Sequence, residues 1–463
     1  MSYEGLRLWA KSANAERSRR ELARRRLGDF AVYTNDKYQV LWFHKQIAAA
    51  LEAVERGEIK KLMVFMPPQH GKSQLTTRAF PSWCIGRNPD LRIAVASYSA
   101  TVARRFNRDV KRIIDSDAYR AAFPDFILPT AKDNSANTTD LIETPSGRGS
   151  LYFVGRGGSL TGMSVDLGII DDPLKDRSEA MSPVILEGLW SWYTDVFASR
   201  ILDTGRQVLI QTRWDQDDLA GRLLTQDGYY SESNPTGWQV ISFPALRTEE
   251  PSPHDPRKVG EALWPERKGV ATLLKIKAKN KVTFNSLYQQ DPKPDEEILI
   301  FHSWQPIDEF PKNVETVIYG GDFGFTNDPT AIVKVGIDGE NLYVEEVSYQ
   351  TDMTNTKIAT LIKAGGLQDE IFVWDSSEPK SIVELQSFGI NAMGAVKGNG
   401  SKNLGIDRLK EYNVFYVKSG VSLTREVKNY KWLVVAGKKT NTPQDGNDHL
   451  MDAIRYVIQT IIT

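Results

Sequence analysis

The stretch M-P-P-Q-H-G-K-S-Q, residues 66–74, decides how the N-terminal half of this chain is interpreted. It contains the end of a phosphate-binding loop, G-x-x-x-x-G-K-[ST], although Met66 stands where that motif has its first glycine. The apolar run K-L-M-V-F before it is typical of a buried parallel strand. The segment after it predicts a helix to about Phe80, because Pro81 lacks a donor. Strand, loop and helix in this order predict a nucleotide site.

The chemistry of such a loop assigns roles to its residues. Backbone N–H groups at the start of a helix hold phosphate oxygens, aided by the helix dipole. Lys72 would reach the β- and γ-phosphates, and the Ser73 hydroxyl would bind Mg²⁺. We therefore expect the nucleotide to contact Gln69, His70, Gly71, Lys72, Ser73 and Gln74.

Four further apolar segments follow, and the fold class that they predict is α/β. The third, V-D-L-G-I-I-D-D-P, ends in two acids. We expect Asp171 to hold the Mg²⁺ shell and Asp172 to orient or deprotonate the attacking water. The fourth, R-Q-V-L-I-Q-T-R-W, places Gln211 and Thr212 at the carboxyl end of a strand, where open α/β sheets bind ligands. Thr212 is therefore expected to sense the γ-phosphate.

Composition limits the possible classes of protein. The chain has 463 residues, of which 41% are hydrophobic, and its net charge of -1 gives no general attraction to nucleic acid, so DNA contacts must come from a local patch. Its single cysteine, Cys84, cannot form an internal disulfide, which fits a reducing cytoplasm. We find no long apolar run or signal peptide and expect no membrane segment. Six arginines between residues 17 and 26 predict a basic helix that contacts phosphates or is simply solvated.

The composition changes after about Pro244, where proline and charged residues lose any apolar period. We expect an ATPase domain with an N-terminal basic helix at 1–245, a linker or lid at 246–310 and a second domain at 311–463.

The second domain contains acids at the ends of predicted elements. Two apolar strands end at Asp322 and Asp375, and a helix carries Asp448 and Asp452 on one face. Strand, strand and helix acids in this order predict a ribonuclease H-like site for two divalent cations, Mg²⁺ or Mn²⁺. Asp452 and Asp448 compete for the third position, and His449 is a candidate for proton transfer or phosphate contact. DNA-guiding or merely solvated basic loops would contain Lys397, Lys402, Arg408, Lys410, Lys438 and Lys439.

Several motifs resemble the large terminase subunits, which package DNA in tailed bacteriophages. These motifs are P-P-Q-H-G-K-S at 67–73, I-I-D-D-P at 169–173, T-R-W followed by acids at 212–218, and F-N-S-L-Y-Q-Q-D-P at 284–292. W-F-H-K-Q, ending in Gln46, is similar to the family's adenine-contacting Q motif. One departure is Asp172, because many members have glutamate there.

The resemblance implies a P-loop ATPase of the ASCE type joined to a metal-dependent endonuclease. ATP hydrolysis with Mg²⁺ would drive double-stranded DNA into the procapsid, and the nuclease would cut concatemeric DNA at both ends of packaging. The implied partners are the portal protein and procapsid, a small terminase subunit and further copies of the chain in a ring. The implied location is the host cytoplasm and, transiently, the portal vertex. The protein would be absent from the mature virion. The implied arginine finger is Arg156, with Arg148 as the alternative. A cellular helicase or repair ATPase with an appended nuclease would share both chemistries.

Overall fold

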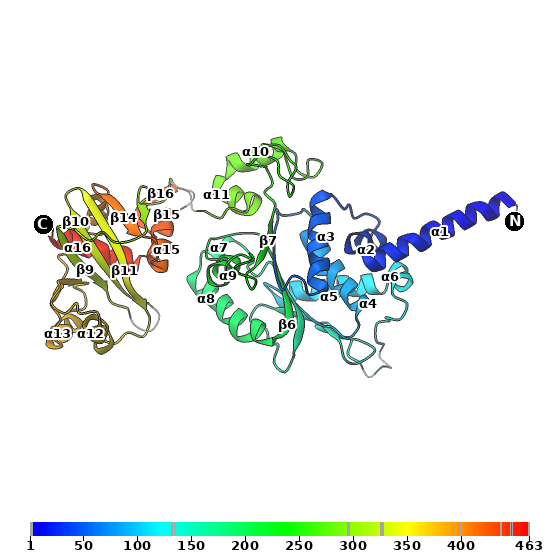
Figure 1. Ribbon diagram of the computed structural model, residues 1–463, viewed down its shortest axis with the longest axis horizontal. Coiled ribbons are helices and arrows are strands. Elements are labelled where there is room, and N and C mark those ends of the chain that lie inside the picture. Colours follow the sequence, from blue (N-terminus) through cyan, green and yellow to red (C-terminus); the bar gives the residue numbers. More distant parts are fainter. Residues whose placement is uncertain are drawn as a thin grey trace. The chain divides into compact units, whose positions relative to one another are not determined.

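The structure, a computed structural model, divides the chain into two compact units, Met1–Lys293 and Pro294–Thr463 (Figure 1). The division falls inside the segment 246–310 that was expected to be a linker or lid, and most of that segment belongs to the first unit. The structure describes residues 3–130, 133, 135–293, 297–324, 328–397, 401–435, 438–444, 446 and 448–461.

Seven described strands form the sheet of the first unit, in the order β3-β4-β2-β5-β6-β1-β7. All neighbours are parallel except β3 and β4, which are antiparallel. The five strands that the sequence predicts are confirmed. The strands are β1 (Lys61–Phe65), β2 (Arg92–Ser97), β3 (Leu141–Glu143), β4 (Ser150–Gly155), β5 (Val165–Asp171), β6 (Ile201–Gln211) and β7 (Gln239–Ser242).

Helices cover both faces of this sheet. Alternate residues of β1 show why, since Leu62 and Val64 belong to one apolar core while Met63 and Phe65 belong to the other. The first core lies under α2 (Leu27–Thr34), α3 (Trp42–Glu55), α4 (Phe80–Arg87), α5 (Ala100–Ile114) and α6 (Asp117–Ala122). The second lies under α8 (Pro183–Trp192) and α9 (Leu219–Asp227). The N-terminal helix α1 (Tyr3–Arg25) packs on α2 and α6.

The chain after the phosphate loop is helical for longer than we expected. A π-helical segment, η1 (Gln74–Ala79), continues directly into α4, with Pro81 in its first turn. The expectation that the helix ends near Phe80 is therefore wrong. Proline is tolerated here because the change from π-helical to α-helical geometry starts a new helix, and its missing N–H falls in the first turn.

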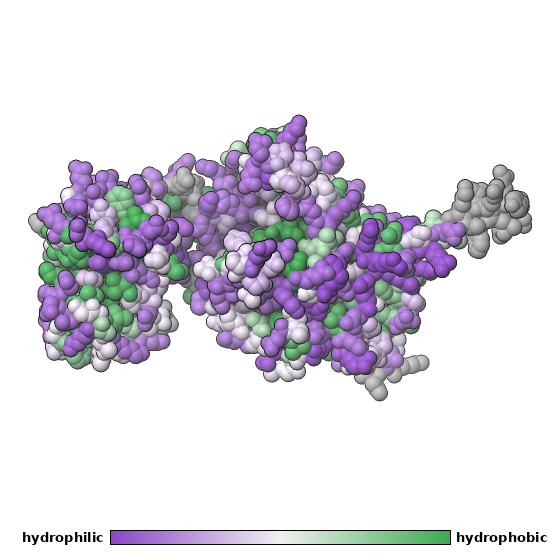
Figure 2. All heavy atoms as spheres, in the orientation of Figure 1, coloured by the Kyte–Doolittle hydropathy of each residue, from purple (hydrophilic) through white to green (hydrophobic). Residues whose placement is uncertain are grey.

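The segment after β7 is ordered, although its sequence has no apolar period. It contains α10 (Val270–Lys279), the short α11 (Lys281–Thr283) and a small core of Ala245, Leu246, Ala262, Leu273 and Phe284. Hydrophilic side chains predominate on the visible face of the first unit as a whole (Figure 2).

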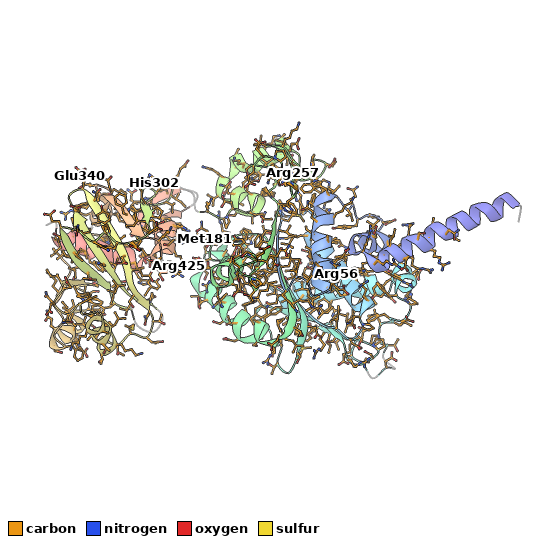
Figure 3. The ribbon with its side chains drawn as sticks, viewed as in Figure 1. Arg56, Met181, Arg257, His302, Glu340 and Arg425 are labelled. Atoms are coloured by element: carbon orange, nitrogen blue, oxygen red, sulfur yellow. The ribbon has the colours of Figure 1, made fainter. Side chains whose placement is uncertain are left out.

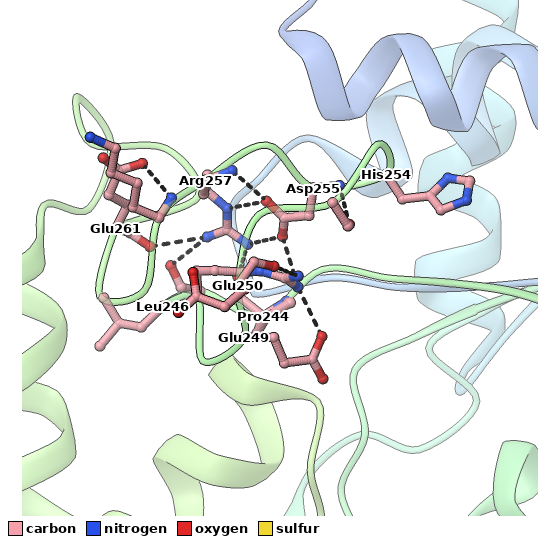
Figure 4. A network of polar contacts seen from close by, with 12 residues as sticks. Pro244, Leu246, Glu249, Glu250, His254, Asp255, Arg257 and Glu261 are labelled. Atoms are coloured by element: carbon pink, nitrogen blue, oxygen red, sulfur yellow. Dashed lines mark hydrogen bonds and ion pairs between the residues drawn. The ribbon is translucent and has the colours of Figure 1, made fainter.

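A buried polar network holds the loop of that segment (Figures 3 and 4). The Arg257 guanidinium donates to both carboxylate oxygens of Asp255 at 2.9 and 2.6 Å, and to the carbonyls of Pro244, Ala245 and Glu261. Arg257 and Asp255 are 5% and 4% exposed. One guanidinium therefore satisfies a buried carboxylate and three chain carbonyls at once.

The second unit also has a seven-stranded described sheet, in the order β13-β12-β9-β10-β11-β14-β8. The strands β10 and β11 form an antiparallel hairpin across the turn at Asp338 and Gly339. The strands are β8 (Gln305–Ile307), β9 (Thr316–Asp322), β10 (Thr330–Asp338), β11 (Asn341–Gln350), β12 (Phe372–Trp374), β13 (Ala392–Gly394) and β14 (Asn413–Val417).

The helices of this unit also lie on both faces of its sheet. One face packs against α14 (Ser401–Leu409), α15 (Val421–Asn429) and α16 (His449–Ile461), and the other against α12 (Asn355–Ala364) and α13 (Pro379–Ser387). A hairpin of β15 (Trp432–Val435) and β16 (Lys438–Pro443) completes the unit.

Glycine allows the last helix to approach the sheet closely. A Cβ on Gly320 of β9 would lie 2.2 Å from the Ala453 carbonyl oxygen of α16. A larger residue at this position would push the helix away, and with it the acids that the helix carries.

Within the described helices, none combines the length and the apolar composition that crossing a bilayer requires.

We predict that Arg257→Met loosens the loop 244–264, because it removes the nearest cation from the buried Asp255 and one donor from each of three carbonyls. The expected loss is about 3 kcal/mol, or about a hundredfold faster amide exchange in that loop. Hydrogen–deuterium exchange of the full chain measures it, with the exposed neighbour Lys258→Met as control. Equal exchange in both variants would show that the network does not hold the loop.

Candidate functional sites

A cleft of about 660 Å³ opens at the carboxyl ends of β1, β5 and β6. This is the sheet edge at which the sequence placed the nucleotide. The residues that line the cleft are Pro68, Gln69, Gly71, Lys72, Ser73, Gln74, Asp172, Thr212, Glu266 and Arg267.

Lys72 joins the phosphate loop to the two neighbouring strands. Its ammonium group donates to Asp172 Oδ1 at 2.9 Å and to Thr212 Oγ1 at 2.5 Å, and the side chain is nearly buried. The Thr212 backbone N–H also donates to Asp172 Oδ1, at 2.8 Å. Three residues that are far apart in sequence thus meet at one point, as the sequence predicts for a nucleotide site.

Asp171 precedes Asp172 in the sequence and is 1% exposed. It accepts hydrogen bonds from Ser73 Oγ at 3.1 Å and Thr77 Oγ1 at 2.5 Å. Burial and the adjacent Asp172 raise the pKa of Asp171 to about 6, while Lys72 opposes the shift. A divalent cation would offset the charge that burial penalises, so the oxygens of Ser73 and Asp171 fit the Mg²⁺ role predicted for them.

The backbone of the site is held in uncommon conformations. Gln69 and Asp172 have φ values of 66° and 45°, in the left-handed region that non-glycine residues seldom adopt. Gly71 has φ of 85°, and a Cβ there would lie 2.9 Å from His44 Nε2. Such conformations persist only where the surroundings impose them, and they gather at functional sites.

His44 supports the loop from beneath, and sequence reasoning missed it. The Leu41 backbone N–H donates to His44 Nδ1 at 3.1 Å, so Nε2 carries the hydrogen and donates to the His70 carbonyl at 2.7 Å. Burial lowers the pKa of His44 to about 4, which keeps the ring neutral and this tautomer in place. The only signal in the sequence was its position in W-F-H-K-Q.

Two of the predicted nucleotide contacts lie elsewhere. The His70 ring is buried against Trp264, with ring centroids 6.2 Å apart, and Nδ1 donates to the Pro68 carbonyl. The Gln46 amide donates to the His254 carbonyl at 2.7 Å. Among the described residues that line the cleft, neither side chain is present. Their contact with nucleotide stays a prediction.

Glu266 and Arg267 line the cleft, although sequence reasoning assigned their segment to a linker or lid. No motif marked them. Trp264, two residues earlier, packs edge-on against His44 with ring centroids 5.6 Å apart. This packing holds the segment beside the phosphate loop.

The candidate arginine fingers are both engaged in ion pairs within the chain. Arg156 forms a two-point ion pair with Glu179 at 2.9 and 3.0 Å and donates to the Pro173 carbonyl. Arg148 pairs with Asp90 at 3.0 Å on a more exposed surface. Their role toward a neighbouring copy stays a prediction.

The second unit brings its predicted acids to one edge of its sheet. Asp322 ends β9, and Asp375 follows β12, which is parallel to β9 and adjacent to it. Helix α16 adds His449, whose Nδ1 lies 3.0 Å from Asp322 Oδ2, and Tyr456, whose hydroxyl donates to Asp375 Oδ2 at 2.8 Å. The predicted strand, strand and helix arrangement is therefore present.

The carboxylates of this edge differ in electrostatic environment. Burial raises the pKa of Asp322, and the charges of Asp452 and Asp375 add to the shift. Although burial opposes it, hydrogen bonds from Lys397, Ser377 and Tyr456 lower the pKa of Asp375 to about 2. Asp375 is thus a firm anion, while Asp322 sits where added positive charge would be favourable.

The two candidates for the third acid share Lys402, which lies 2.8 Å from Asp448 and 3.7 Å from Asp452, and differ in their other partners. Asp448 accepts from Lys402 at 2.8 Å and from the Gly446 N–H at 3.3 Å. Asp452 pairs with Arg455 at 3.2 Å, and its charge acts on Asp322. This electrostatic coupling to a strand acid favours Asp452 over Asp448.

The donor chemistry fits divalent cations, because the groups are carboxylate oxygens whose mutual repulsion a cation would relieve. The spacing is not that of a closed cage: within the described ranges, no three His, Cys, Asp or Glu side chains form a group that could hold a metal ion. Lys397 and Lys402 provide positive charge at the carboxylates instead.

Glu426 is a further residue that sequence reasoning missed. It is fully buried on α15, and its Oε2 accepts from the backbone N–H groups of Leu450 and Met451, at 2.9 and 3.1 Å. These are orphan donors in the first turn of α16, beside Asp448 and Asp452. A carboxyl group from one helix therefore fixes the start of the helix that carries the acids.

Comparison with known proteins matches both units. A model described as terminase large subunit, T4likevirus-type, N-terminal matches residues 63–240, and one described as terminase RNAseH like domain matches 322–460. The PBSX phage terminase large subunit of Bacillus subtilis (strain 168) is 31% identical over 99 residues, or 21% of this chain. That match spans 23% of the relative's length.

Solved structures with similarity include two large terminases. The nuclease domain of the bacteriophage SPP1 large terminase with bound Mn is 25% identical and covers 34% of this chain and 96% of its own, with a TM-score of 0.32. A large terminase from a thermophilic bacteriophage is 14% identical and covers 93% of this chain and 98% of its own, with a TM-score of 0.30.

We predict that Glu426 makes the start of α16 sensitive to pH. Burial raises its pKa to about 7 from an ordinary 4.5, so the protonated form is favoured in the folded chain. The contribution of protonated Glu426 to the free energy of unfolding is fully present below pH 4.5. It is lost as the pH rises through 7, and the loss amounts to up to about 3 kcal/mol.

Hydrogen exchange over 449–461, corrected for intrinsic pH dependence, measures this effect. Glu426→Gln keeps an acceptor without titrating, so the parent should lose protection relative to this variant between about pH 5 and 8. The exposed Glu411→Gln is the control. Parallel curves for the parent and Glu426→Gln would assign the titration to another group.

Proposed function

Since this chain belongs to the terminase large subunits, whose two family models together cover more than half of it, we propose that it is a DNA-packaging motor subunit. Its first unit hydrolyses ATP to move double-stranded DNA into a procapsid, and its second unit cuts that DNA. The observation that carries the proposal is that one chain combines the Lys72–Asp172–Thr212 cluster with an edge of acids at Asp322, Asp375 and Asp452.

The ATPase step follows from the contacts of Lys72. In this structure Lys72 neutralises Asp172, so it must leave that carboxylate to reach the β- and γ-phosphates. Asp172 is then free to orient a water and accept its proton as the water oxygen attacks the γ-phosphorus. The bond to the β-phosphate oxygen breaks, and ADP and phosphate are released. Ser73 and Asp171 would hold Mg²⁺, which offsets the charge of the phosphates.

Thr212 links this chemistry to the rest of the unit. Its hydroxyl and backbone contact Lys72 and Asp172, and the next residue, Arg213, pairs with the buried Asp218 at 2.9 Å. Asp218 caps α9 by accepting from the Gly221 N–H. A change at the γ-phosphate therefore reaches a helix through one strand end, which is the coupling that a motor requires.

In the nuclease unit, Asp322, Asp375 and Asp452 would hold divalent cations, which activate water and stabilise the leaving oxygen. The contact of His449 Nδ1 with Asp322 supports a role of His449 in transferring a proton during cutting. Although burial opposes it, Asp322 and neighbouring carboxylates raise the pKa of His449 above its ordinary value. As a cation, His449 would also attract a DNA phosphate.

The roles of individual residues and the identities of the partners depend on the proposed motor function. We propose that Arg156 leaves Glu179 to reach the nucleotide of a neighbouring copy in a ring, and that Gln46 contacts adenine. The proposed partners are a portal protein on a procapsid and a small terminase subunit, with the motor acting in the host cytoplasm. The division of the chain into 1–245, 246–310 and 311–463 is retained as a functional proposal.

We predict that the two activities separate by mutation. Lys72→Ala should lower ATP turnover by roughly a hundredfold or more, because it removes the phosphate ligand, and leave nuclease activity measurable. Asp375→Ala should abolish cutting of plasmid DNA with Mn²⁺ and leave ATP turnover intact. Exposed controls are Lys258→Ala and Asp369→Ala. Cutting by Asp375→Ala at the parent's rate would remove Asp375 from the site.

Packaging itself tests the biological role. Purified procapsids with bound portal should protect DNA from nuclease digestion when given the parent and ATP, and not when given Lys72→Ala. ATP-dependent strand separation without packaging would instead establish the helicase alternative.

A further inference from the structure

We propose that the arginine face of α5 binds the phosphate backbone of duplex DNA, an inference that rests on the proposed function and identifies the DNA contact of the ATPase unit. We define the arginine face as Arg105, Arg108 and Arg112 together with the groove beside them. That groove has a volume of about 370 Å³ and is lined by Gln74, Arg78, Asp109, Arg112 and Ile113.

The sequence of α5 separates an apolar side from a cationic one. Ala103, Phe106 and Val110 are buried in the core, while Arg105, Arg108 and Arg112 follow at helical spacing on the exposed side. At about 1.5 Å rise per residue, Arg105 to Arg112 spans about 10 Å. That length equals the rise along the duplex axis of roughly three phosphates of one strand.

Two of these arginines have no acidic partner in the part of the chain that the structure describes. Arg105 and Arg108 are exposed, and no ion pair to either occurs among the described residues, whereas the neighbouring Arg104 pairs with Asp140 at 2.8 Å. In the groove, Asp109 is shared by Arg78 at 2.7 Å and Arg112 at 3.3 Å. The face therefore carries an excess of positive charge that the chain, with a net charge of -1, does not have as a whole.

The chemistry of the face favours nucleic acid over protein. A protein interface has an apolar core with a polar rim, but no residue of α5, which is described along its whole length, is among the exposed large hydrophobic side chains. Arginine forks match phosphate oxygens bidentately, and contacts to the backbone need no apolar centre. A protein partner, including an acidic surface of a second copy, fits these features less well.

The groove also adjoins the nucleotide cleft. Gln74 lines both, and the π-helical η1 that follows Lys72 and Ser73 carries Arg78 into the groove. Arg78 stacks over Phe106 of α5, with its guanidinium carbon 4.8 Å from the ring centroid. A phosphate bound in the groove would thus touch the short helix that directly follows the proposed ATP-binding loop, and η1 would connect the two ligands.

The binding test uses the full chain with EDTA, so that DNA is not cut. Arg105→Ala/Arg108→Ala is compared with Lys275→Ala/Lys279→Ala, which removes the same charge from exposed positions of α10. For a fluorescent duplex, we expect roughly tenfold weaker affinity and a salt-dependence slope lower by about 2 for the arginine variant alone.

A crosslinking test locates the contact. The one cysteine, Cys84, is buried, so Arg108→Cys can be labelled alone with a thiol-reactive photocrosslinker. We expect crosslinks to duplex DNA from position 108 and far fewer from a matched Lys275→Cys.

The outcomes separate the two proposals. If the parent binds DNA and packages it but both double variants bind equally well, or crosslinks are equal at 108 and 275, the arginine face is not the contact while the motor function stands. If the parent binds no DNA, both proposals fail. If the arginine variant changes self-association and leaves DNA affinity unaltered, the face serves a second copy of the chain and the DNA assignment is overturned.

Discussion

The ion pair between Lys72 and Asp172 is the interaction on which the first unit is organised. It joins the loop after β1 to the end of β5, and Thr212 brings in the end of β6. A nearly buried ammonium group is tolerable only beside a carboxylate, so the three elements must converge. In the proposed ATPase, the same arrangement would shield Asp172 until phosphates draw Lys72 away. One contact would thus both hold the three elements together and keep Asp172 inactive before nucleotide binds.

The sequence was sufficient to predict those parts of the fold and the sites where the local apolar pattern and the chemistry of the residues agree. Apolar strands ending in a loop or an acid predicted β1, β5 and β12, and the loop chemistry assigned Lys72 and Asp172 to one nucleotide site. Residues that act through another residue's backbone could not be predicted. His44 and Glu426 are each polar groups in helices that gave no reason to expect burial, and their roles exist only once a distant carbonyl or N–H lies opposite. The loop around Arg257 was missed because a polar network, and not apolar periodicity, orders it.

The second unit meets the problem of clustered acids in a different way. Lys397 and Lys402 lie on the carboxylates that cations would otherwise bridge, so the edge of the sheet is electrically balanced by the chain itself. In the proposed nuclease, metal binding would therefore exchange one cation for another. Freed lysines would stand next to the phosphates of the substrate.

The pairing of β7 with β1 has a mechanical consequence. The two strands run parallel in register from Leu62 and Gln239, and the Phe243 N–H continues the ladder to the Phe65 carbonyl. Tension on the chain beyond β7 acts along the direction of the strands. It therefore loads the hydrogen bonds between β1 and β7 in shear, and these bonds share the force instead of opening one after another. Force on the segment that follows is therefore transmitted directly to the strand that carries the phosphate loop.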